Sequence, residues 1–314
     1  MHPPRVAILI PSYNSAGTIS QALDSVQRQL PADAGDLSVY LADDASKDDT
    51  IAVARQTWKA EIPLRVIARE WNLGQWPNKN GALAEIANDA DWVLILHSDD
   101  FARSKWLSVL LDRISHCPAS VGSICLGWKN LHVENPAPEP EDDVPPKIEE
   151  IEGTPESIRW TLLKGCWWLI SGCAIRLAAF QDVGPFDPQF PYGGDYEWLL
   201  RCLRKGWDVE FVEKNLTFRR SLSASVAGQA SLRHLDIRDY IRIYNRYASA
   251  LAPAELFHLH AKACFTLVKR MARSILNRNV RRFLGAWSTL FWVLGKLSSY
   301  TAQLPRTFRL RQAR

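Results

Sequence analysis

Short apolar runs alternate with stretches of helical periodicity over the first 130 of the 314 residues. The runs are long enough for buried strands, and the stretches between them repeat apolar positions every three to four residues, as amphipathic helices do. Strands and helices that alternate in this way form a largely parallel sheet with helices on its faces. We predict strands at 6–10, 37–43, 64–68 and 91–97 and helices at 15–30, 48–60 and 77–89.

The pattern changes after residue 130. Residues 134–152 carry eight acidic residues and five prolines, which is typical of an irregular solvated loop. A helix at 154–165, a short strand at 171–176 and a helix at 193–206 are predicted to follow. From about residue 235 the chain is predicted to be helical, with apolar residues at a period of 3.6 at positions 257, 261, 264, 268, 272, 275 and 283.

Charge is distributed unevenly along the chain. The net charge is +4, yet no acidic residue follows Glu255, and the segment after it contains 12 basic residues. The first 255 residues therefore carry a net charge of −8, so body and tail differ in electrostatic role. The acidic body and the lack of a recognition motif argue against nucleic-acid binding.

The six cysteines show neither a CxxC pair nor zinc-ligand spacing. They are predicted to be reduced thiols, which fits a reducing cytoplasm. The N-terminal apolar run ends at Pro11 and is too short for a signal peptide or a membrane span.

Three of the four predicted strands end in polar clusters, with the sequences PSYN, DDASKDD and HSDD. Ligands of open α/β sheets bind beyond the carboxyl ends of the strands. In the last cluster Asp99 and Asp100 stand side by side with no basic neighbour. Paired carboxylates suit Mg²⁺ or Mn²⁺ bound together with a substrate phosphate. The alternative is that they cap a helix at 104–114.

The middle cluster contains two acidic pairs. Asp48 and Asp49 begin a predicted helix, where negative charge complements the helix dipole. Asp43 and Asp44 come before that helix, and their carboxylates are predicted to accept hydrogen bonds from a nucleobase edge or a ribose hydroxyl.

Five segments occur in the order seen in glycosyltransferase family 2, and the chain resembles that family over about residues 5–225. The segments are ILIPSYN, LADDASKDDT, NLGQWPNKNGAL, ILHSDD and GPFDPQFPYGGDYEWLLR. The resemblance implies the α/β GT-A fold, which is Rossmann-like with a mostly parallel central sheet flanked by helices. It also implies an inverting transfer from a UDP-, GDP- or dTDP-linked sugar.

The resemblance assigns roles to residues at the strand ends. It implies that the donor nucleotide lies against Pro11, Tyr13, Asp44, Asn72, Gly74 and Lys79. Relatives often have Arg at the position of Lys79. Asp99 and Asp100 match the DxD-type element, one directed to the ribose and the other to the metal. His97 stands where many relatives have a further Asp, and we expect it to be a packing residue or to support the metal ligands.

The catalytic base implied by the resemblance is Asp195, although the Glu that usually precedes it is Gly194 here. In an inverting transfer an acceptor hydroxyl attacks the anomeric carbon as the nucleoside diphosphate leaves, and the base takes the proton of that hydroxyl. A helix cap is the alternative role for Asp195. Glu197, the nearest other carboxylate, should point about 200° away on a helix.

Two pairs of neighbouring residues, two arginines and two tryptophans, are each consistent with more than one role. Relatives often carry a histidine in an RxH element, but this chain has Arg219 and Arg220 without one, and either guanidinium suits the donor diphosphate. Trp167 and Trp168 are interpreted either as core residues or as a stacking platform for an acceptor sugar.

The uncharged stretch 283–295 lies between Arg282 and Lys296. A membrane span needs roughly 20 apolar residues, so this segment is predicted to be interfacial or buried. Basic flanks are attracted to an anionic leaflet. We predict peripheral attachment to the inner face of the cytoplasmic membrane, with docking on the rest of the chain or dimerisation as alternatives.

These features predict a metal-dependent inverting glycosyltransferase of cell-envelope glycan or polysaccharide biosynthesis, acting on a glycan or lipid-linked acceptor. The catalytic domain is predicted at 1–230, with halves 1–130 and 151–230, and a helical extension at 231–314. A sugar-phosphate nucleotidyltransferase is one alternative, but a glycine-rich loop after the first strand is lacking. A non-catalytic sugar-nucleotide-binding protein is the other.

Overall fold

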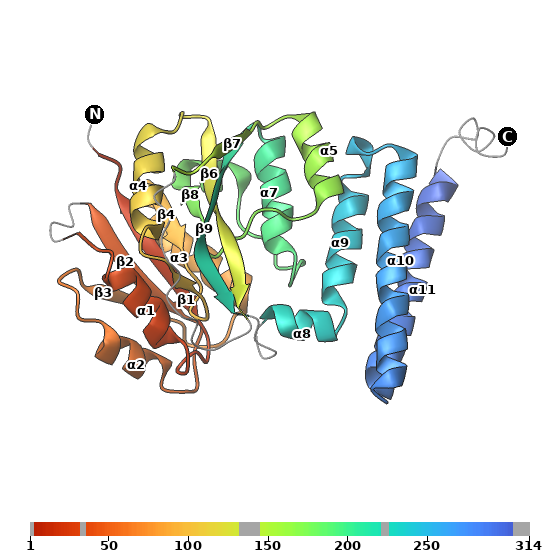
Figure 1. Ribbon diagram of the computed structural model, residues 1–314, viewed down its shortest axis with the longest axis horizontal. Coiled ribbons are helices and arrows are strands. Elements are labelled where there is room, and N and C mark those ends of the chain that lie inside the picture. Colours follow the sequence, from red (N-terminus) through yellow and green to blue (C-terminus); the bar gives the residue numbers. More distant parts are fainter. Residues whose placement is uncertain (1–2, 32–35, 132–144, 221–225, 304–314) are drawn as a thin grey trace. The chain divides into compact units, whose positions relative to one another are not determined.

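The computed structural model describes residues 3–31, 36–131, 145–220 and 226–303 (Figure 1). The chain divides into two compact units. Unit 1 comprises residues up to Phe190 together with Gly194–Leu222, and unit 2 comprises Pro191–Gly193 and the chain from Ser223 onward.

The first half of unit 1 is the parallel part of a nine-stranded sheet, with strand order β3-β2-β1-β4. All three pairs in this order are parallel, as the alternating pattern predicts. The four strands lie close to their predicted positions, at β1 (Val6–Ser12), β2 (Leu37–Asp43), β3 (Leu64–Ala68) and β4 (Trp92–Ile95).

Helices connect these strands. They are α1 (Ile19–Gln27), α2 (Thr50–Thr57), α3 (Gln75–Ile86) and α4 (Trp106–His116). α1, α2 and α4 begin two to four residues later than the apolar pattern predicts, whereas α3 begins two residues earlier. Before α1 the carbonyl of Ser15 accepts hydrogen bonds from the backbone of Thr18 and Ile19, so this segment is a turn. Asp48 likewise precedes α2 and accepts the backbone N–H of Ala16 at 3.0 Å, which confirms its structural role.

The second half of the sheet is mixed. Its strands are β5 (Phe101–Ala102), β6 (Val121–Leu131), β7 (Ile148–Ile151), β8 (Ala174–Arg176) and β9 (Asp208–Arg220). β8 joins β4 to β6 by antiparallel pairing, and β9 runs parallel to β6. β7 corrects the prediction of an irregular loop over 134–152, because its backbone pairs with β9; residues 132–144 of that loop lie outside the described residues.

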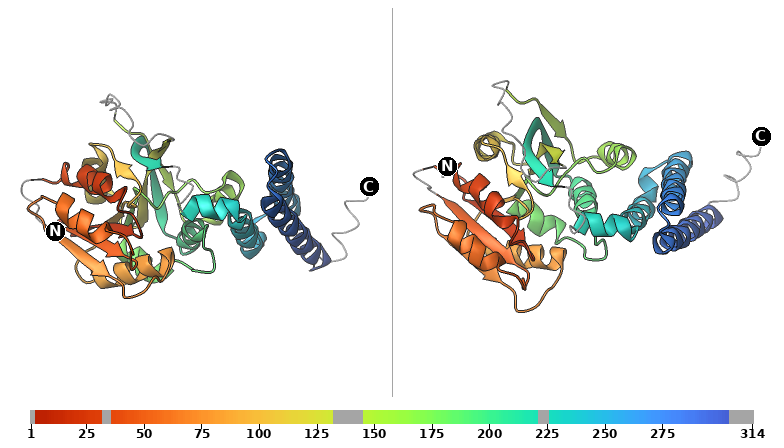
Figure 2. Two further views of the ribbon diagram at one scale, coloured as in Figure 1. Left: turned by 90° about the horizontal axis from the view of Figure 1, so that it is seen from below. Right: turned by 60° about the horizontal axis from the view of Figure 1, so that its bottom comes forward.

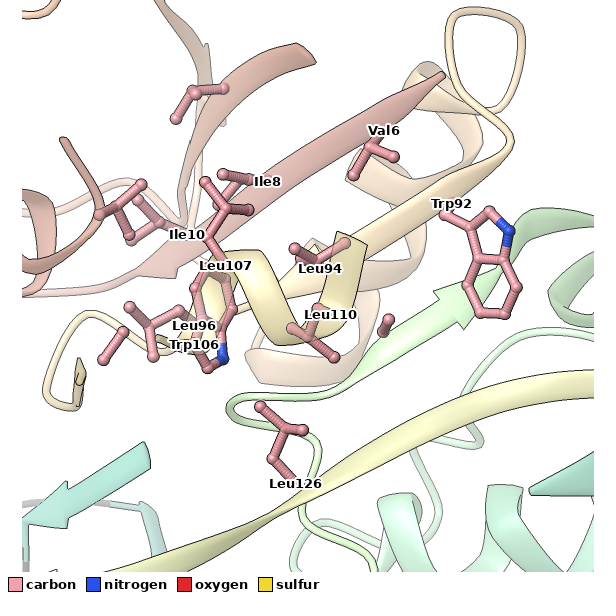
Figure 3. Packing of buried hydrophobic residues seen from close by; sticks show 14 of the residues in the cluster. Val6, Ile8, Ile10, Trp92, Leu94, Leu96, Trp106, Leu107, Leu110 and Leu126 are labelled. Carbon is pink, nitrogen blue, oxygen red and sulfur yellow. The ribbon is translucent and has the colours of Figure 1, made fainter. Parts of the chain in front are cut away.

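The core of unit 1 follows the alternation of side chains along the central strands (Figure 3). Val6, Ile8 and Ile10 of β1 point to the same face as Trp92 and Leu94 of β4. α4 covers this face with Trp106, Leu107 and Leu110, and Leu126 of β6 extends the same cluster. The carboxyl ends of β1 and β4 are therefore held rigidly, which fixes the polar residues that follow them.

Three more helices complete unit 1: α5 (Pro155–Lys164), α6 (Leu177–Val183) and α7 (Gly194–Arg204). Thr154 caps α5 by accepting the backbone N–H of Ser157, as the sequence predicts for this helix start. α7 begins at a glycine pair and carries the predicted base in its first turn.

Unit 2 is helical, which confirms the prediction for the chain beyond residue 235 (Figures 1 and 2). It contains α8 (Val226–Leu232), α9 (Leu235–Arg246), a 3₁₀ turn (Ala248–Ala250), α10 (Pro253–Leu276) and α11 (Val280–Gln303). α10 and α11 pack against each other along their length. Within the described residues, no helix combines the length and hydropathy needed to cross a bilayer.

Candidate active site

The turn after β2 is held by Asp43. Its carboxylate accepts hydrogen bonds from the hydroxyls of Ser12 and Ser46, at 2.9 and 2.6 Å, and from the backbone N–H of Ser46 at 2.8 Å. The side chain is buried, and it links the ends of β1 and β2. Asp43 thus has a structural role here, and its contact with a donor stays a prediction.

Asp44 gathers the predicted donor residues of the next loop. Its two carboxylate oxygens accept the backbone N–H groups of Leu73 and Gly74, at 2.8 and 2.9 Å. The amide of Asn72 donates to the Asp44 carbonyl at 3.3 Å. Gly74 has a φ of 91°, in the region that favours glycine, and it directly precedes α3. The structure therefore brings Asp44, Asn72 and Gly74 together, and Tyr13 is 44% exposed at the end of β1.

Lys79 lies one turn into α3 and is almost completely buried. Its ammonium donates to Gln75 Oε1 at 3.3 Å and lies 4.6 Å from the ring centre of Trp76. Burial lowers the pKa of Lys79 to about 8, against the opposing charges of Asp195, Asp99 and Asp44. The lysine is thus electrostatically coupled to carboxylates from three different strand or helix ends.

His97, Asp99 and Asp100 form a cluster after β4 whose ligand atoms lie within 4.8 Å of one another. Nε2 of His97 is buried without a hydrogen-bond partner. Burial, with help from Lys79 and Arg219, holds the pKa of His97 well below its usual value, so the imidazole is neutral. A neutral imidazole and two carboxylates are a donor set that fits a divalent cation. The structure thus places His97, which sequence reasoning kept outside the ligands, in one cluster with Asp99 and Asp100.

The two carboxylates of this cluster repel each other. Burial and the charge of Asp99 raise the pKa of Asp100 to about 7, and burial also raises the pKa of Asp99. Asp100 accepts the backbone N–H of Arg220 at 3.0 Å, and its side chain also hydrogen-bonds Ser171. A bound cation would relieve this repulsion, because it favours the ionised form of both acids.

The end of β9 holds the cluster in place. The guanidinium of Arg220 donates to the Asp99 carbonyl at 3.0 Å and lies over the ring of Phe101. The charge of Arg219 opposes the rise in the pKa of Asp99, Asp100 and Asp195, and the charge of Arg220 opposes that of Asp99. Both arginines therefore supply positive charge to the site, and Arg220 is also held by its hydrogen bond to Asp99.

Asp195 lies in the first turn of α7 and accepts the backbone N–H of Tyr196 at 2.8 Å. Burial raises its pKa to about 6, although Lys79 and Arg219 oppose the shift. The carboxylate is therefore mostly ionised at neutral pH and still basic enough to take a proton. Glu197 is fully buried in an ion pair with Nε of Arg201 at 2.8 Å, which gives it a structural role.

The glycine before Asp195 is explained by Trp76. A Cβ atom on Gly194 would lie 2.6 Å from the indole ring of Trp76. That ring is fixed, because its Nε1 donates to the Phe190 carbonyl at 2.8 Å and it stacks on Phe186. The space next to the predicted base is thus filled by an indole from α3, and only glycine fits there.

The prediction of an acceptor platform at Trp167 and Trp168 is corrected by their burial. Their exposed fractions are 6% and 1%, so neither ring has a face available to a sugar. Trp168 donates to Ser123 Oγ and stacks on Trp198, and Trp167 donates to Thr161 Oγ1. The core interpretation is the one that holds.

Several residues near the site were not identified from sequence. Trp71, next to Asn72, is 64% exposed, while Ser171 contacts both the backbone N–H of His97 and the carboxylate of Asp100. Trp76 shapes the surroundings of Asp195. These contacts join segments far apart in the chain, and no local pattern signals them.

The mixed sheet, with acidic residues after β2 and β4 and a carboxylate at the start of α7, defines the GT-A class of fold. Residues 7–134 match the family model described as "Glycosyl transferase family 2".

Curated relatives and solved structures agree with this assignment. GalNAc(5)-diNAcBac-PP-undecaprenol beta-1,3-glucosyltransferase of Campylobacter jejuni is 30% identical over 125 residues, which are 39% of this chain and 38% of that protein. S. aureus TarS, in complex with UDP-GlcNAc, has a TM-score of 0.57 at 14% identity, with 89% of each chain covered. Mannosyltransferase PcManGT from Pyrobaculum calidifontis, in complex with GDP-Man and Mn²⁺, has a TM-score of 0.54 at 16% identity, covering 96% of this chain and 88% of that one.

Proposed function

We propose that this chain is a metal-dependent inverting glycosyltransferase that moves a sugar from a nucleoside diphosphate donor to a hydroxyl of a glycan, lipid-linked or polysaccharide acceptor. The observation that carries the proposal is the shared electrostatic environment of Asp195, Lys79 and Asp99 in unit 1. A base with a raised pKa, a buried cation and a cation-binding cluster within one network are what the reaction requires.

The donor base is assigned to the ends of β1 and β2. Pro11 lies near the end of β1 and Tyr13 follows it, and the Asp44 carboxylate organises the loop that carries Asn72 and Gly74. UDP-, GDP- and dTDP-sugars are the candidate donors, since TarS is described with UDP-GlcNAc and PcManGT with GDP-Man. The exposed rings of Tyr13 and Trp71 offer faces on which a nucleobase can stack.

The divalent cation is assigned to His97, Asp99 and Asp100, with Mg²⁺ or Mn²⁺ as the ion. When bound, such an ion offsets the charge that builds on the leaving diphosphate. Arg219 and Lys79 are assigned to the same diphosphate, because both bring positive charge to these acids. PcManGT, described with Mn²⁺, supports a metal in this fold.

Asp195 is assigned the proton transfer. Its carboxylate accepts the proton of the acceptor hydroxyl as that oxygen bonds to the anomeric carbon and the bond from this carbon to the diphosphate breaks. One such displacement inverts the configuration at the anomeric carbon. Trp76 fills the space beside Gly194, next to this carboxylate.

The experiment that tests the proposal measures the products released from a panel of UDP-, GDP- and dTDP-sugars with Mn²⁺, with Mg²⁺ and with chelator. A glycosyltransferase releases the nucleoside diphosphate, and release should stop in chelator. A sugar-phosphate nucleotidyltransferase would instead release pyrophosphate in a parallel assay that supplies a nucleoside triphosphate and a sugar phosphate. Donor binding without any product would favour the non-catalytic alternative.

The catalytic domain is assigned to 1–230 and the helical extension to 231–314. We place the enzyme in the cytoplasm, at the inner face of the membrane, in the assembly of a cell-envelope glycan. The excess of basic residues after Glu255 supports this location.

A further inference from the structure

α10 presents three kinds of surface around its circumference. One side packs inside unit 2 and is formed by Leu256, Leu259, His260, Ala263, Leu267, Met271 and Ser274. A second side is apolar and exposed, with Phe257, Phe265, Val268, Ile275 and Leu276. Lys262, Lys269 and Arg273 lie within about 40° of one another around the helix and form a basic row beside this stripe.

α11 repeats this arrangement. Ala286, Thr289 and Val293 are buried, and the exposed side carries Val280, Leu284, Trp287, Phe291 and Leu294. Arg281 and Lys296 are exposed near the ends of this stripe. The uncharged segment 283–295 is therefore buried on one side only.

The two exposed stripes lie on the same side of the helix pair. Arg270 of α10 pairs with Asp236 of α9, and Thr289 of α11 accepts a hydrogen bond from Arg238 of α9. Val268 and Phe291 are each two positions from these contacts, which places them about 200° away on their helices. Both stripes therefore face away from α9, and together they form one surface, which we call the hairpin face.

The hairpin face is unusually apolar for an exposed surface. It holds ten of the fifteen large hydrophobic side chains that are exposed in the described part of the chain. Contiguous apolar patches of this kind mark interaction sites. Rings of tryptophan and phenylalanine bordered by lysine and arginine are the composition of helices that lie in the headgroup layer of a bilayer.

The charges of unit 2 indicate what kind of surface the hairpin face binds. From residue 223 onward the sequence has 16 basic and 3 acidic residues. Asp236 is paired with Arg270, Asp239 is fully buried, and Glu255 accepts the backbone N–H of Ala252 at the start of α10. No carboxylate therefore occurs along α10 or α11 beyond the first turn of α10, and a negatively charged surface meets no repulsion there.

A second copy of the chain is a poorer partner on the same grounds. A symmetric dimer through the hairpin face would bring its basic rows near their own copies, since such an interface joins the same patch of both subunits. The like charges would then oppose association. An anionic bilayer instead attracts the basic rows and takes up the apolar stripe.

We propose that the hairpin face docks in the headgroup layer of an anionic phospholipid bilayer, with α10 and α11 lying along the surface. Resting on the proposed function, this assigns the acceptor to a lipid-linked glycan held in that bilayer. Docking does not itself depend on transferase activity, so the two proposals fail separately.

Flotation of the full-length protein with vesicles tests the docking. The vesicles contain phosphatidylcholine alone or phosphatidylcholine with phosphatidylglycerol. We expect binding to the anionic vesicles, weaker binding to the neutral ones, and partial loss in high salt because screening weakens only the charge contribution. The triple variant Phe265→Ser, Trp287→Ser, Phe291→Ser should bind roughly a hundredfold more weakly, since three exposed rings no longer enter the bilayer.

The matched control is Leu232→Ser, which removes an exposed apolar side chain of unit 2 outside α10 and α11 and should bind like the unchanged protein. Circular dichroism and thermal unfolding show whether each variant is folded. Equal vesicle binding by the folded triple variant would overturn the proposal. So would a wild-type dimer that ignores vesicles and becomes monomeric in the triple variant. If docking is retained but only soluble acceptors are used, the assignment of the acceptor is wrong and the docking surface stands.

Discussion

The proposed proton transfer depends on one carboxylate, that of Asp195. Asp195→Asn keeps the size of the side chain and its contact with the backbone of Tyr196, but it removes the base. We expect donor affinity within a few fold of wild type and turnover lower by roughly 10²- to 10⁴-fold. Steady-state kinetics and titration of the donor check both numbers.

Glu197→Gln provides the contrast for this variant. Glu197 is buried against Arg201, so its loss should lower the melting temperature, because the guanidinium loses an anionic partner. The folded fraction should keep its turnover. If Asp195→Asn remains active while folded Glu197→Gln does not, the base has been assigned to the wrong acid.

The pH dependence should report the same carboxylate. The pKa of Asp195 is raised to about 6, so half of the molecules carry a protonated, inactive base at that pH. We expect kcat/KM at saturating Mn²⁺ to fall by about tenfold per pH unit below pH 6. Above pH 7 the protonation of Asp195 should change it little. A profile that stays level from pH 8 down to pH 5 would contradict the assignment.

His97 distinguishes the proposed metal site from a purely carboxylate one. His97→Ala should weaken Mn²⁺ binding by at least about tenfold, because the buried, unpartnered Nε2 is lost as a ligand. His97→Asp should restore cation binding and shift preference toward Mg²⁺, which favours oxygen ligands. Calorimetric titration of the metal measures both, and His116→Ala, at an exposed histidine, is the control. Unchanged Mn²⁺ affinity in His97→Ala would remove His97 from the site.

At the scale of the elements, α3 and α7 meet where Trp76 contacts Gly194. Gly194→Ala should destabilise the fold by about 1–3 kcal/mol, since its Cβ would strike the indole ring. The cost should be smaller when Trp76→Phe is made first, because the smaller ring leaves room. Urea unfolding of the two single variants and the double variant measures this coupling. Additive effects would show that the two residues are not in contact.

Sheet pairing is also decided at this scale. The apolar runs of β1 and β4 were predicted from sequence because these strands are buried on both faces, and those of β2 and the partly exposed β3 because their sequences are short and mostly apolar. β7 was missed because its sequence, IEEI, looks polar and solvated, and pairing with β9 is what makes it a strand. A local pattern reports the burial of a segment, whereas an edge strand is defined by its partner.

For the whole molecule, metal binding should be visible as stability. A cation that binds only the folded chain raises the free energy of unfolding by about 2.7 kcal/mol at a concentration 100 times its dissociation constant. We expect Mn²⁺ to raise the melting temperature of the wild type and to leave that of the Asp99→Asn, Asp100→Asn double variant unchanged. Scanning calorimetry with Mn²⁺ and with chelator measures the shift, and an equal shift in both proteins would place the ion elsewhere.

Sequence alone predicted the parallel half of the sheet, the acidic strand ends and the position of Asp195, because each depends on residues close together in the chain. It left His97, Trp76 and Arg219 without definite roles, since their contacts join segments that only folding brings together. The platform predicted at Trp167 and Trp168 failed for the same reason, because a ring's exposure depends on what packs over it.

α10 shows this division most clearly. The sequence predicts one apolar stripe on this helix, at positions 257, 261, 264, 268, 272 and 275, and helical spacing alone does not reveal whether that stripe is covered. Packing in unit 2 buries the stripe that contains Leu256, Leu259 and Leu267, and it leaves Phe257, Phe265 and Val268 exposed. Periodicity predicts which side chains share a face of a helix. Only the tertiary structure decides whether protein or solvent lies against that face, because burial depends on the neighbouring elements and not on the helix itself.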